Sequence, residues 1–205
     1  TLKPVEDLVS QLLPHMPPEK VHTFSCGHVV SPDRILPLAL ARGPSGAPLE
    51  FKHENRSNPA ALDELGRLLV NVCKVVPQGV VCFLPSFAYE EQVHRHFAST
   101  GVLGTLGRRK RVFREPRSAA DVEKVLKDYA AVNERPGAPP GGLTGALLFS
   151  VVGGKMSEGI NFSDGLGRCV VMVGLPYPNA RDPELLERLR FLDRPVGALR
   201  ERDVN

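Results

Sequence analysis

The sequence lacks the two motifs with which P-loop motor ATPases hold ATP: it contains no GxxxxGK[ST] run and no DEAH box. Its one Gly-Lys pair, Gly154-Lys155, has Phe149 in place of the first glycine and Met156 in place of the final Ser or Thr. The chain therefore lacks the groups that cradle the β- and γ-phosphates and bind Mg²⁺. No Ser-His-Asp or Cys-His pattern can be assembled with any specificity either.

Metal-type cysteine spacing, strong net charge and long apolar runs are also absent. The cysteines at positions 26, 73, 82 and 169 form no CxxC pair, so we expect small buried residues of a reducing compartment rather than disulfides or a metal site. No apolar run approaches the roughly 20 residues of a membrane span. With no secretory signal, we expect a soluble, intracellular protein. The net charge is only +3, so nucleic-acid binding would need a local basic patch.

Alternating helix and strand patterns indicate the fold class. Hydrophobic residues make up 42% of the 205 residues, enough for a domain with its own core. Apolar stripes predict helices at residues 5–13, 59–76, 89–97, 119–133 and 182–192. Short apolar runs bounded by Gly and Pro predict strands at residues 20–25, 35–41, 80–84, 112–113, 146–152 and 169–175. The later strands are fully apolar, which favours an α/β fold with a mainly parallel, buried sheet flanked by helices.

The densest group of polar side chains follows the strand predicted at residues 146–152. The segment GGKMSEGIN, residues 153–161, would leave the sheet at the carboxyl end of a strand, where open α/β sheets bind ligands. Paired glycines allow the backbone to approach a phosphate closely. An ordinary strand-to-helix turn remains open, with a solvated lysine at Lys155 and a local helix cap at Glu158.

A second group follows the apolar run at residues 80–84. Ser86 lies where a hydroxyl and the free N–H groups of a helix start would converge, which suits a phosphate but equally suits a plain N-cap. Phe87 could stack on a base or belong to the core. The basic run at residues 108–111, with Arg114 and Arg117 beyond it, is interpreted either as a phosphate contact or as a solvated face.

Several stretches resemble one known family, in the same order along the chain. Residues 153–179, GGKMSEGINFSDGLGRCVVMVGLPYPN, resemble motif V and the following strand of the XPD/DinG-like superfamily 2 DNA helicases, which are iron–sulfur enzymes of the DEAH type. The opening TLKP resembles the end of their motif III. FSCGHVV, GVVCFLPSF and KRVFREP, at residues 24–30, 79–87 and 110–116, resemble further segments. The combination is most similar to the Chl-type helicases of sister-chromatid cohesion.

This resemblance implies a RecA-like second motor lobe at residues 1–193, from the end of motif III through motif V, followed by a loose tail at residues 194–205. Motif VI, QxxGRxxR, would follow Asp193 and is not found in the chain. Motif V faces the ATP cleft in the family, so the implied cleft residues are Gly154, Lys155, Ser157, Glu158, Gly159 and Asn161. Asn161 departs from the Asp of many relatives. With the charge pattern, the expected DNA contacts are Ser86, Phe87, Arg109, Lys110 and Arg111.

The resemblance also implies parts that lie outside this chain. ATP and Mg²⁺ would be cofactors of the intact enzyme, and a 4Fe–4S cluster would lie only in the first lobe, so we expect this chain alone to bind no metal or cofactor. The implied partners are the first helicase lobe, single-stranded or forked DNA, and cohesion or replication proteins, with nuclear localisation, no membrane and 5′ to 3′ movement. The alternative is a truncated, non-catalytic isoform or paralogue that binds nucleic acid or protein. A stand-alone hydrolase or transferase would need a catalytic constellation that the sequence does not contain.

Because the phosphate-cradling and Mg²⁺-binding motifs are missing, we expect the 205-residue chain to hydrolyse no ATP by itself. Phosphate release should be measured with Mg²⁺, in the presence and absence of single-stranded DNA. Mg²⁺-dependent turnover above a protein-free blank would contradict this expectation.

Overall fold

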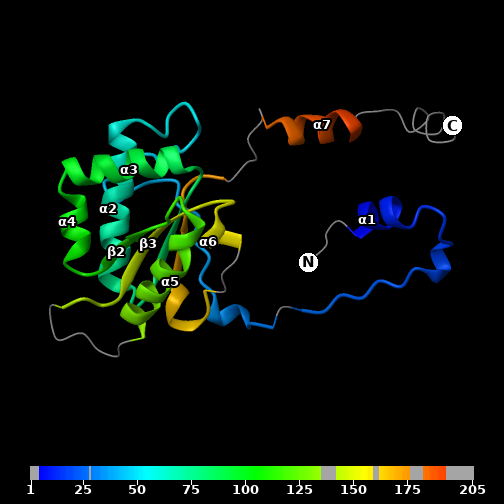
Figure 1. The fold of residues 1–205 in the computed structure, drawn as a ribbon, viewed down its shortest axis with the longest axis horizontal. Coiled ribbons are helices and arrows are strands. Elements are labelled where there is room, and N and C mark those ends of the chain that lie inside the picture. The colour runs from blue at the N-terminus through cyan, green and yellow to red at the C-terminus, as the bar shows by residue number, and fades with distance from the viewer. Residues whose placement is uncertain (1–4, 28, 135–141, 159–161, 176–181, 193–205) are drawn as a thin grey trace. The chain divides into compact units, whose positions relative to one another are not determined.

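The computed structural model describes residues 5–27, 29–134, 142–158, 162–175 and 182–192 (Figure 1). The chain divides into two units, residues 1–39 and residues 40–205, which we call the N-terminal segment and the α/β unit. The N-terminal segment contains helix α1 (Val5–Leu12) and two short 3₁₀ turns, η1 (Pro18–Lys20) and η2 (Pro32–Arg34).

None of the described residues of the N-terminal segment is buried. The helix predicted at residues 5–13 is confirmed, but the strands predicted at residues 20–25 and 35–41 are wrong. The described part of the segment offers no neighbouring strand with which these apolar runs could pair, and Pro37 removes a ladder donor from the second run.

The α/β unit contains a parallel sheet with the strand order β2-β3-β1-β4. All three strand pairs are parallel, with Val80 of β1 opposite both Leu147 and Cys169, and Arg111 opposite Ala146. This confirms the predicted α/β fold with a parallel sheet. The strands are β1 (Val80–Leu84), β2 (Arg111–Arg114), β3 (Ala146–Val151) and β4 (Cys169–Met172).

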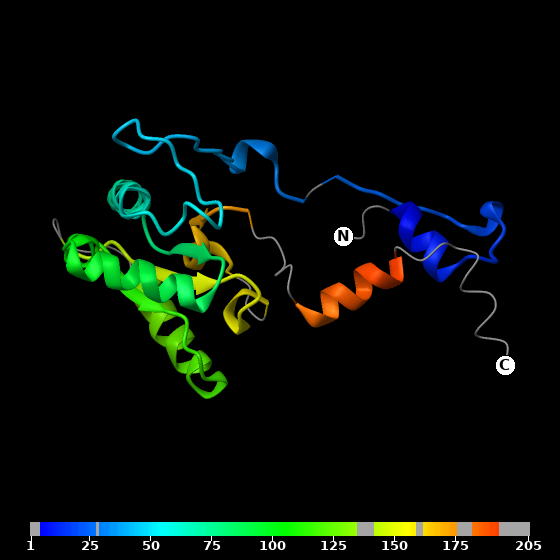
Figure 2. The same cartoon turned by 90° about the horizontal axis from the view of Figure 1, so that it is seen from above.

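Helices cover both faces of the sheet (Figure 1). Figure 2 shows α2 and α5 on opposite sides of the strands. Side-chain caps fix four helix starts: Asn58, Ser86, Ser118 and Asp182 each accept a hydrogen bond from a backbone N–H of the first turn. No helix in the described ranges is long and apolar enough to cross a membrane. The helices are α2 (Pro59–Val75), α3 (Phe87–Ser99), α4 (Val102–Gly107), α5 (Ala119–Asn133), α6 (Lys155–Glu158) and α7 (Pro183–Leu192), with the 3₁₀ turn η3 (Asp164–Gly167).

The core lies in two layers because successive side chains of a strand point to opposite faces. Cys82 and Phe149 pack with residues of α2 and α3, whereas Val81 and Leu148 pack with Tyr129 of α5. The thiols of Cys73 and Cys82 are buried, and burial raises the pKa of Cys73 to about 11. These two cysteines are the expected small buried residues.

Three details differ from the sequence-based expectations. Cys26 is exposed rather than buried. Strand β4 is only half-buried, since Val170 is 52% exposed and Met172 is 46% exposed, so the expectation of a fully buried strand is wrong there. Helix α4 was not predicted, because its six residues include Gly104 and Gly107, and glycine is a poor helix former.

Close backbone contacts seal the sheet at the edge where its strands begin. Gly79, directly before β1, donates its N–H to the carbonyl of Gly165 at 2.8 Å. The hydroxyl of Tyr129 donates to the carbonyl of Leu166 at 2.6 Å. A Cβ on Gly79 would overlap both that carbonyl oxygen and the Tyr129 hydroxyl. Only a glycine fits between these two groups.

We therefore expect Gly79→Ala to lower the free energy of unfolding by about 2 kcal/mol or more, because the groups it meets are backbone and a hydrogen-bonded hydroxyl that cannot move aside. Gly104→Ala is the matched control: its added Cβ meets no atom within 4 Å, and alanine favours a helix by up to about 1 kcal/mol. Urea unfolding followed by circular dichroism measures both changes. Equal stability of the two variants would contradict the close approach at Gly79.

Candidate functional site

Three loops leave the sheet at the edge where its parallel strands end. Residues 85–86 follow β1 and lead into α3, residues 152–154 follow β3 and lead into α6, and residues 115–118 follow β2 and lead into α5. The pairing of Leu84 with Val151, and the bond from Val152 N–H to the Leu84 carbonyl at 2.9 Å, align the first two exits. This carboxyl-terminal edge is where open α/β sheets bind ligands. Residues 153–157 of the predicted cleft and the Ser86–Phe87 part of the predicted DNA contacts lie there.

The turn after β3 is built around a buried carboxylate. Glu115, 5% exposed, accepts hydrogen bonds from Ser150 Oγ at 2.7 Å, Val151 N at 2.8 Å and Met156 N at 3.1 Å. Gly154 lies directly against this carboxylate, where a Cβ would overlap Glu115 Oε1. The glycine is therefore required by the close approach of the Glu115 side chain.

The predicted cleft residues occupy different environments in this turn. Lys155 is exposed at the start of α6. Ser157 is half-buried, and its hydroxyl donates to the carbonyl of Gly154 at 2.8 Å. Glu158 is the last residue of α6. Gly159 and Asn161 lie outside the described residues, so only Gly154, Lys155 and Ser157 can be placed fully. Of these, Lys155 offers its charge to solvent.

Ser86 and Phe87 lie at the start of α3. Ser86 Oγ accepts a hydrogen bond from Tyr89 N at 3.2 Å, so its reading as an N-cap is confirmed. Phe87 is half-buried and belongs to neither core cluster of the described residues. The guanidinium of Arg117 lies 5.7 Å from the centre of the Phe87 ring, a distance typical of a cation–π contact. The Phe87 ring is thus a surface aromatic covered on one side by an arginine.

The protein itself neutralises part of the basic run. Arg114 Nε and Nη2 donate to the two carboxylate oxygens of Glu90, both at 2.7 Å. Arg117 pairs with Glu91 at 2.9 Å. The hydrogen bond that Arg114 donates to Glu90 is the main cause that raises the pKa of Arg114. The anions that compensate these two arginines come from α3 and not from a bound phosphate.

Lys110 is fully buried, which contradicts its predicted exposure to DNA. Its ammonium donates to the carbonyls of Gln78 at 2.6 Å and Thr144 at 3.3 Å, and burial lowers its pKa. A buried lysine that donates to two carbonyl groups at the edge where the strands begin is not available to bind a phosphate. Its long alkyl chain and these two acceptors explain how a residue in a basic run becomes part of the interior.

Arg109 and Arg111 lie at the opposite edge of the sheet from Ser86. Arg111 begins β2 opposite Ala146, the first residue of β3, and the carbonyl of Arg109 accepts from Thr144 N at 2.8 Å. At roughly 3.3 Å per residue, the length of β3 separates the two edges by about 17 Å. Arg111 is exposed and Arg109 half-buried. The predicted DNA contacts therefore do not form one continuous surface.

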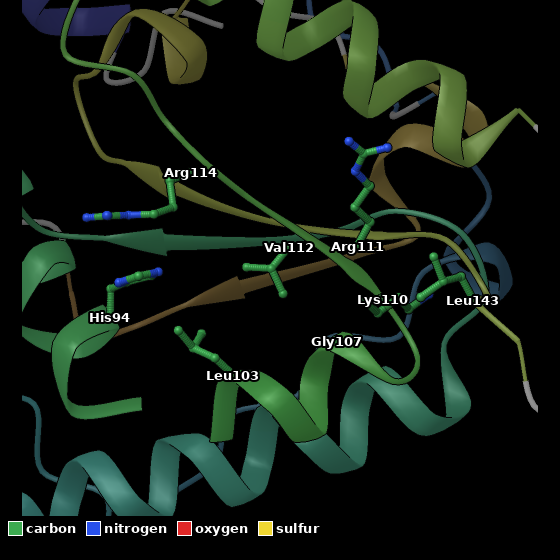
Figure 3. Close-up of a pocket in the computed structure, with 8 residues that line it drawn as sticks. All are labelled: His94, Leu103, Gly107, Lys110, Arg111, Val112, Arg114 and Leu143. Carbon is green, nitrogen blue, oxygen red and sulfur yellow. The ribbon is translucent and has the colours of Figure 1, made fainter. Parts of the chain in front are cut away.

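A cavity of about 360 Å³ lies beside β2, on the face covered by α3 and α4 (Figure 3). Figure 3 shows Leu103 and Val112 pointing toward each other across it, with His94 and Arg114 at one end. Burial is the main cause that lowers the pKa of His94. The lining contains no carboxylate, and the described residues hold no cluster of three or more His, Cys, Asp or Glu that could bind a metal ion. The cavity therefore has the form of a packing gap beside an edge strand, without a catalytic set.

Sequence reasoning missed Glu115, Glu90 and Glu91. Glu115 lies in the stretch KRVFREP at residues 110–116, where the cations alone indicated a ligand contact. The available signal was an acidic residue two positions after the strand predicted at residues 112–113. Which strands are neighbours could not be read from the sequence.

Comparison with known proteins agrees with this architecture. Residues 69–201 match the model of the family described as "Helicase C-terminal domain". The chain is 55% identical over 199 residues to the ATP-dependent DNA helicase DDX11 of Homo sapiens, covering 96% of this chain and 20% of that protein. It is 53% identical over 196 residues to DDX11 of Danio rerio, covering 95% of this chain and 22% of that protein. It is 40% identical over 195 residues to the ATP-dependent DNA helicase CHL1 of Candida albicans, covering 94% and 22%.

The chain thus spans about a fifth of the length of the curated relatives that it matches. The match covers most of this chain and includes both loops at the carboxyl-terminal edge. With a parallel four-stranded sheet between two helical layers, the chain belongs to the helicase C-terminal domain family, as a RecA-like C-terminal lobe of the DDX11/CHL1 type of XPD-like helicases.

Proposed function

We propose that this chain is the second motor lobe of an ATP-dependent DNA helicase that moves 5′ to 3′. The observation that carries this proposal is the alignment of β1 with β3, which delivers the Ser86–Phe87 loop and the turn at residues 153–157 to one edge of the sheet. The relatives are named ATP-dependent DNA helicases. We further propose that the lobe extends over residues 1–193, with residues 194–205 as a tail, and acts in the nucleus with DNA and with cohesion or replication proteins.

The turn at residues 153–157 would form one wall of a nucleotide cleft. It supplies an exposed ammonium at Lys155 and an exposed backbone at Gly153. These groups suit the anionic side of a nucleotide. We propose that the same wall also includes Glu158, Gly159 and Asn161. The described turn offers no cradle for a β- or γ-phosphate, so the groups that bind Mg²⁺ and the phosphates would come from the first lobe.

A 4Fe–4S cluster does not fit the described cysteines of this chain. Cluster ligation needs four thiolates that converge. Cys73 and Cys82 are buried in the core beside apolar side chains, while Cys26 is exposed in the N-terminal segment. The proposal therefore assigns any iron–sulfur cluster of the intact enzyme to the first lobe.

Single-stranded DNA would meet this lobe at Ser86, Phe87 and Arg117. Base stacking on an aromatic ring needs one free face, and the Phe87 ring is half-buried with Arg117 on one side. The arginine pairs with Glu91 but is itself 69% exposed in its side chain, so it can also contact a phosphate. Arg109 and Arg111 would reach only a nucleic acid that continues to the opposite edge of the sheet.

The intact protein should separate a forked duplex that carries a 5′ single-stranded tail, in a reaction that requires ATP. A duplex with only a 3′ tail is the control substrate, on which we expect little or no separation. Strand separation should be followed with a fluorophore and quencher on opposite strands. ATP-independent binding without any separation would instead support a non-catalytic nucleic-acid-binding module.

Phe87→Ala in the intact helicase should weaken binding to single-stranded DNA by about tenfold, because a base–aromatic stack contributes roughly 1–3 kcal/mol. Phe87→Leu keeps apolar volume without a π-face and should lose nearly as much. The double variant Arg109→Ala/Arg111→Ala should lose clearly less, since both residues lie at the far edge. Fluorescence anisotropy with a labelled oligonucleotide at one fixed salt concentration compares the three variants. A larger loss in the arginine variant would reject the proposed DNA path.

A further inference from the structure

Two consecutive residues, Arg114 at the end of β2 and Glu115 directly after it, contact the two candidate sites. Arg114 forms its paired hydrogen bonds with Glu90 of α3, the helix that Ser86 caps. Glu115, the next residue, holds the turn after β3 and the start of α6. Successive side chains leave a strand on opposite faces, so neighbouring residues can reach two different layers. The segment from Arg114 to Arg117, which we call the β2 exit, therefore contacts both the proposed DNA side and the proposed nucleotide side.

On the nucleotide side, the Glu115 carboxylate is fully engaged in hydrogen bonds. Both oxygens of the Glu115 carboxylate are used: Oε2 accepts from Ser150 Oγ and Val151 N, and Oε1 accepts from Met156 N. Ser150 is fully buried, and Met156 is fully buried in the core layer below α5. Because Gly154 rests directly on Glu115 Oε1, the turn cannot shift toward the sheet unless the carboxylate moves as well.

On the DNA side, two arginines of the β2 exit form ion pairs with glutamates of α3. In the Arg114–Glu90 pair the carboxylate is nearly buried, with 4% of the Glu90 side chain exposed, whereas 41% of the Arg114 side chain is exposed. The two parallel N–H···O bonds fix the geometry of this pair. Three residues later, Arg117 pairs with Glu91 and lies over the Phe87 ring. Any displacement of the β2 exit is therefore passed to the first turn of α3.

We propose that Glu115 is a positioning residue that couples the nucleotide-side turn to the DNA-side helix. This inference rests on the proposed helicase function and adds to it the route by which the two sites communicate. When the turn at Gly154 moves with the state of the nucleotide, Glu115 moves with it, and Arg114 and Arg117 carry the displacement to Phe87. Glu115 itself touches neither nucleotide nor DNA in this scheme.

Glu115→Gln tests the coupling with almost no change in shape. An amide has one acceptor oxygen and one donor nitrogen, so at least one of the three N–H or O–H groups that face Glu115 loses its acceptor and the turn loosens. The quantity to measure is the ratio of ATP turnover with single-stranded DNA to turnover without it, in the intact helicase. We expect this ratio to fall at least about fivefold, within the usual range of coupling between two sites.

Two further variants keep this test independent of folding. Glu123→Gln, at an exposed glutamate of α5, makes the same chemical change at a position without a described contact and should leave both rates unchanged. Ser150→Ala removes one donor to the Glu115 carboxylate and should reduce the ratio in the same direction, by less. Thermal unfolding of all three variants should be recorded beside the rates.

The outcomes distinguish a failure of the proposed helicase function from a failure of the coupling role of Glu115 alone. If the wild-type helicase itself is not stimulated by single-stranded DNA, the proposed function fails and this coupling fails with it. If the wild type is stimulated and Glu115→Gln retains the full ratio, only the coupling role is overturned. A Glu115→Gln variant that loses stability and loses both rates in proportion would also overturn it, because that is the behaviour of a residue with a purely structural role.

Discussion

The parallel pairing of β1 with β3 is the constraint on which the site depends. Leu84 and Val151 are the last residues of these strands and lie opposite each other, so the chain must leave the sheet twice at the same level. One exit leads to Ser86 and the other to Gly154. An antiparallel pairing, or a register shifted by a few residues, would send the two loops to different edges. The function proposed for this lobe follows from that one alignment, since neither loop carries enough chemistry alone.

The run of cations in the sequence did not predict which charges remain free at the protein surface. A run of cations at residues 108–117 crosses an entire strand, so its first members lie at one edge of the sheet and its last at the other. Arg114 is neutralised by Glu90 of α3, and Lys110 is buried against two carbonyl groups. Partners that come from other parts of the chain decide which charges remain free. Among the cations predicted to contact nucleotide or DNA, Lys155 and Arg111 are exposed to solvent.

Local patterns predicted the elements of the α/β unit but not its close contacts. Strand β1 and helix α5 have the predicted bounds, residues 80–84 and 119–133, because each combines a clear apolar period with a turn or cap at its ends. The failures have tertiary causes. Strands were expected in the N-terminal segment where the described residues supply no pairing partner, and β4 was expected to be fully buried although Val170 and Met172 are exposed. Glu115 was missed because a buried carboxylate becomes necessary only when three donors converge on it in space.

The two edges of the sheet differ in a way that fits a motor lobe. At the edge where strands begin, polar groups are satisfied within the protein: Lys110 binds the Gln78 carbonyl, and Asn133 Oδ1 accepts from Ala146 N at 2.9 Å. Tyr129 packs edge-on against Phe113 and Phe162 there, with ring centres 5.7 and 6.3 Å away. Buried polar groups with all their partners rigidify a structure. The opposite edge instead presents Lys155 and the half-buried Phe87 ring above the anchored carboxylate of Glu115. The proposed binding and release of ligands at one edge would require the other edge to hold the strands in register, and the distribution of satisfied and exposed groups is consistent with that requirement.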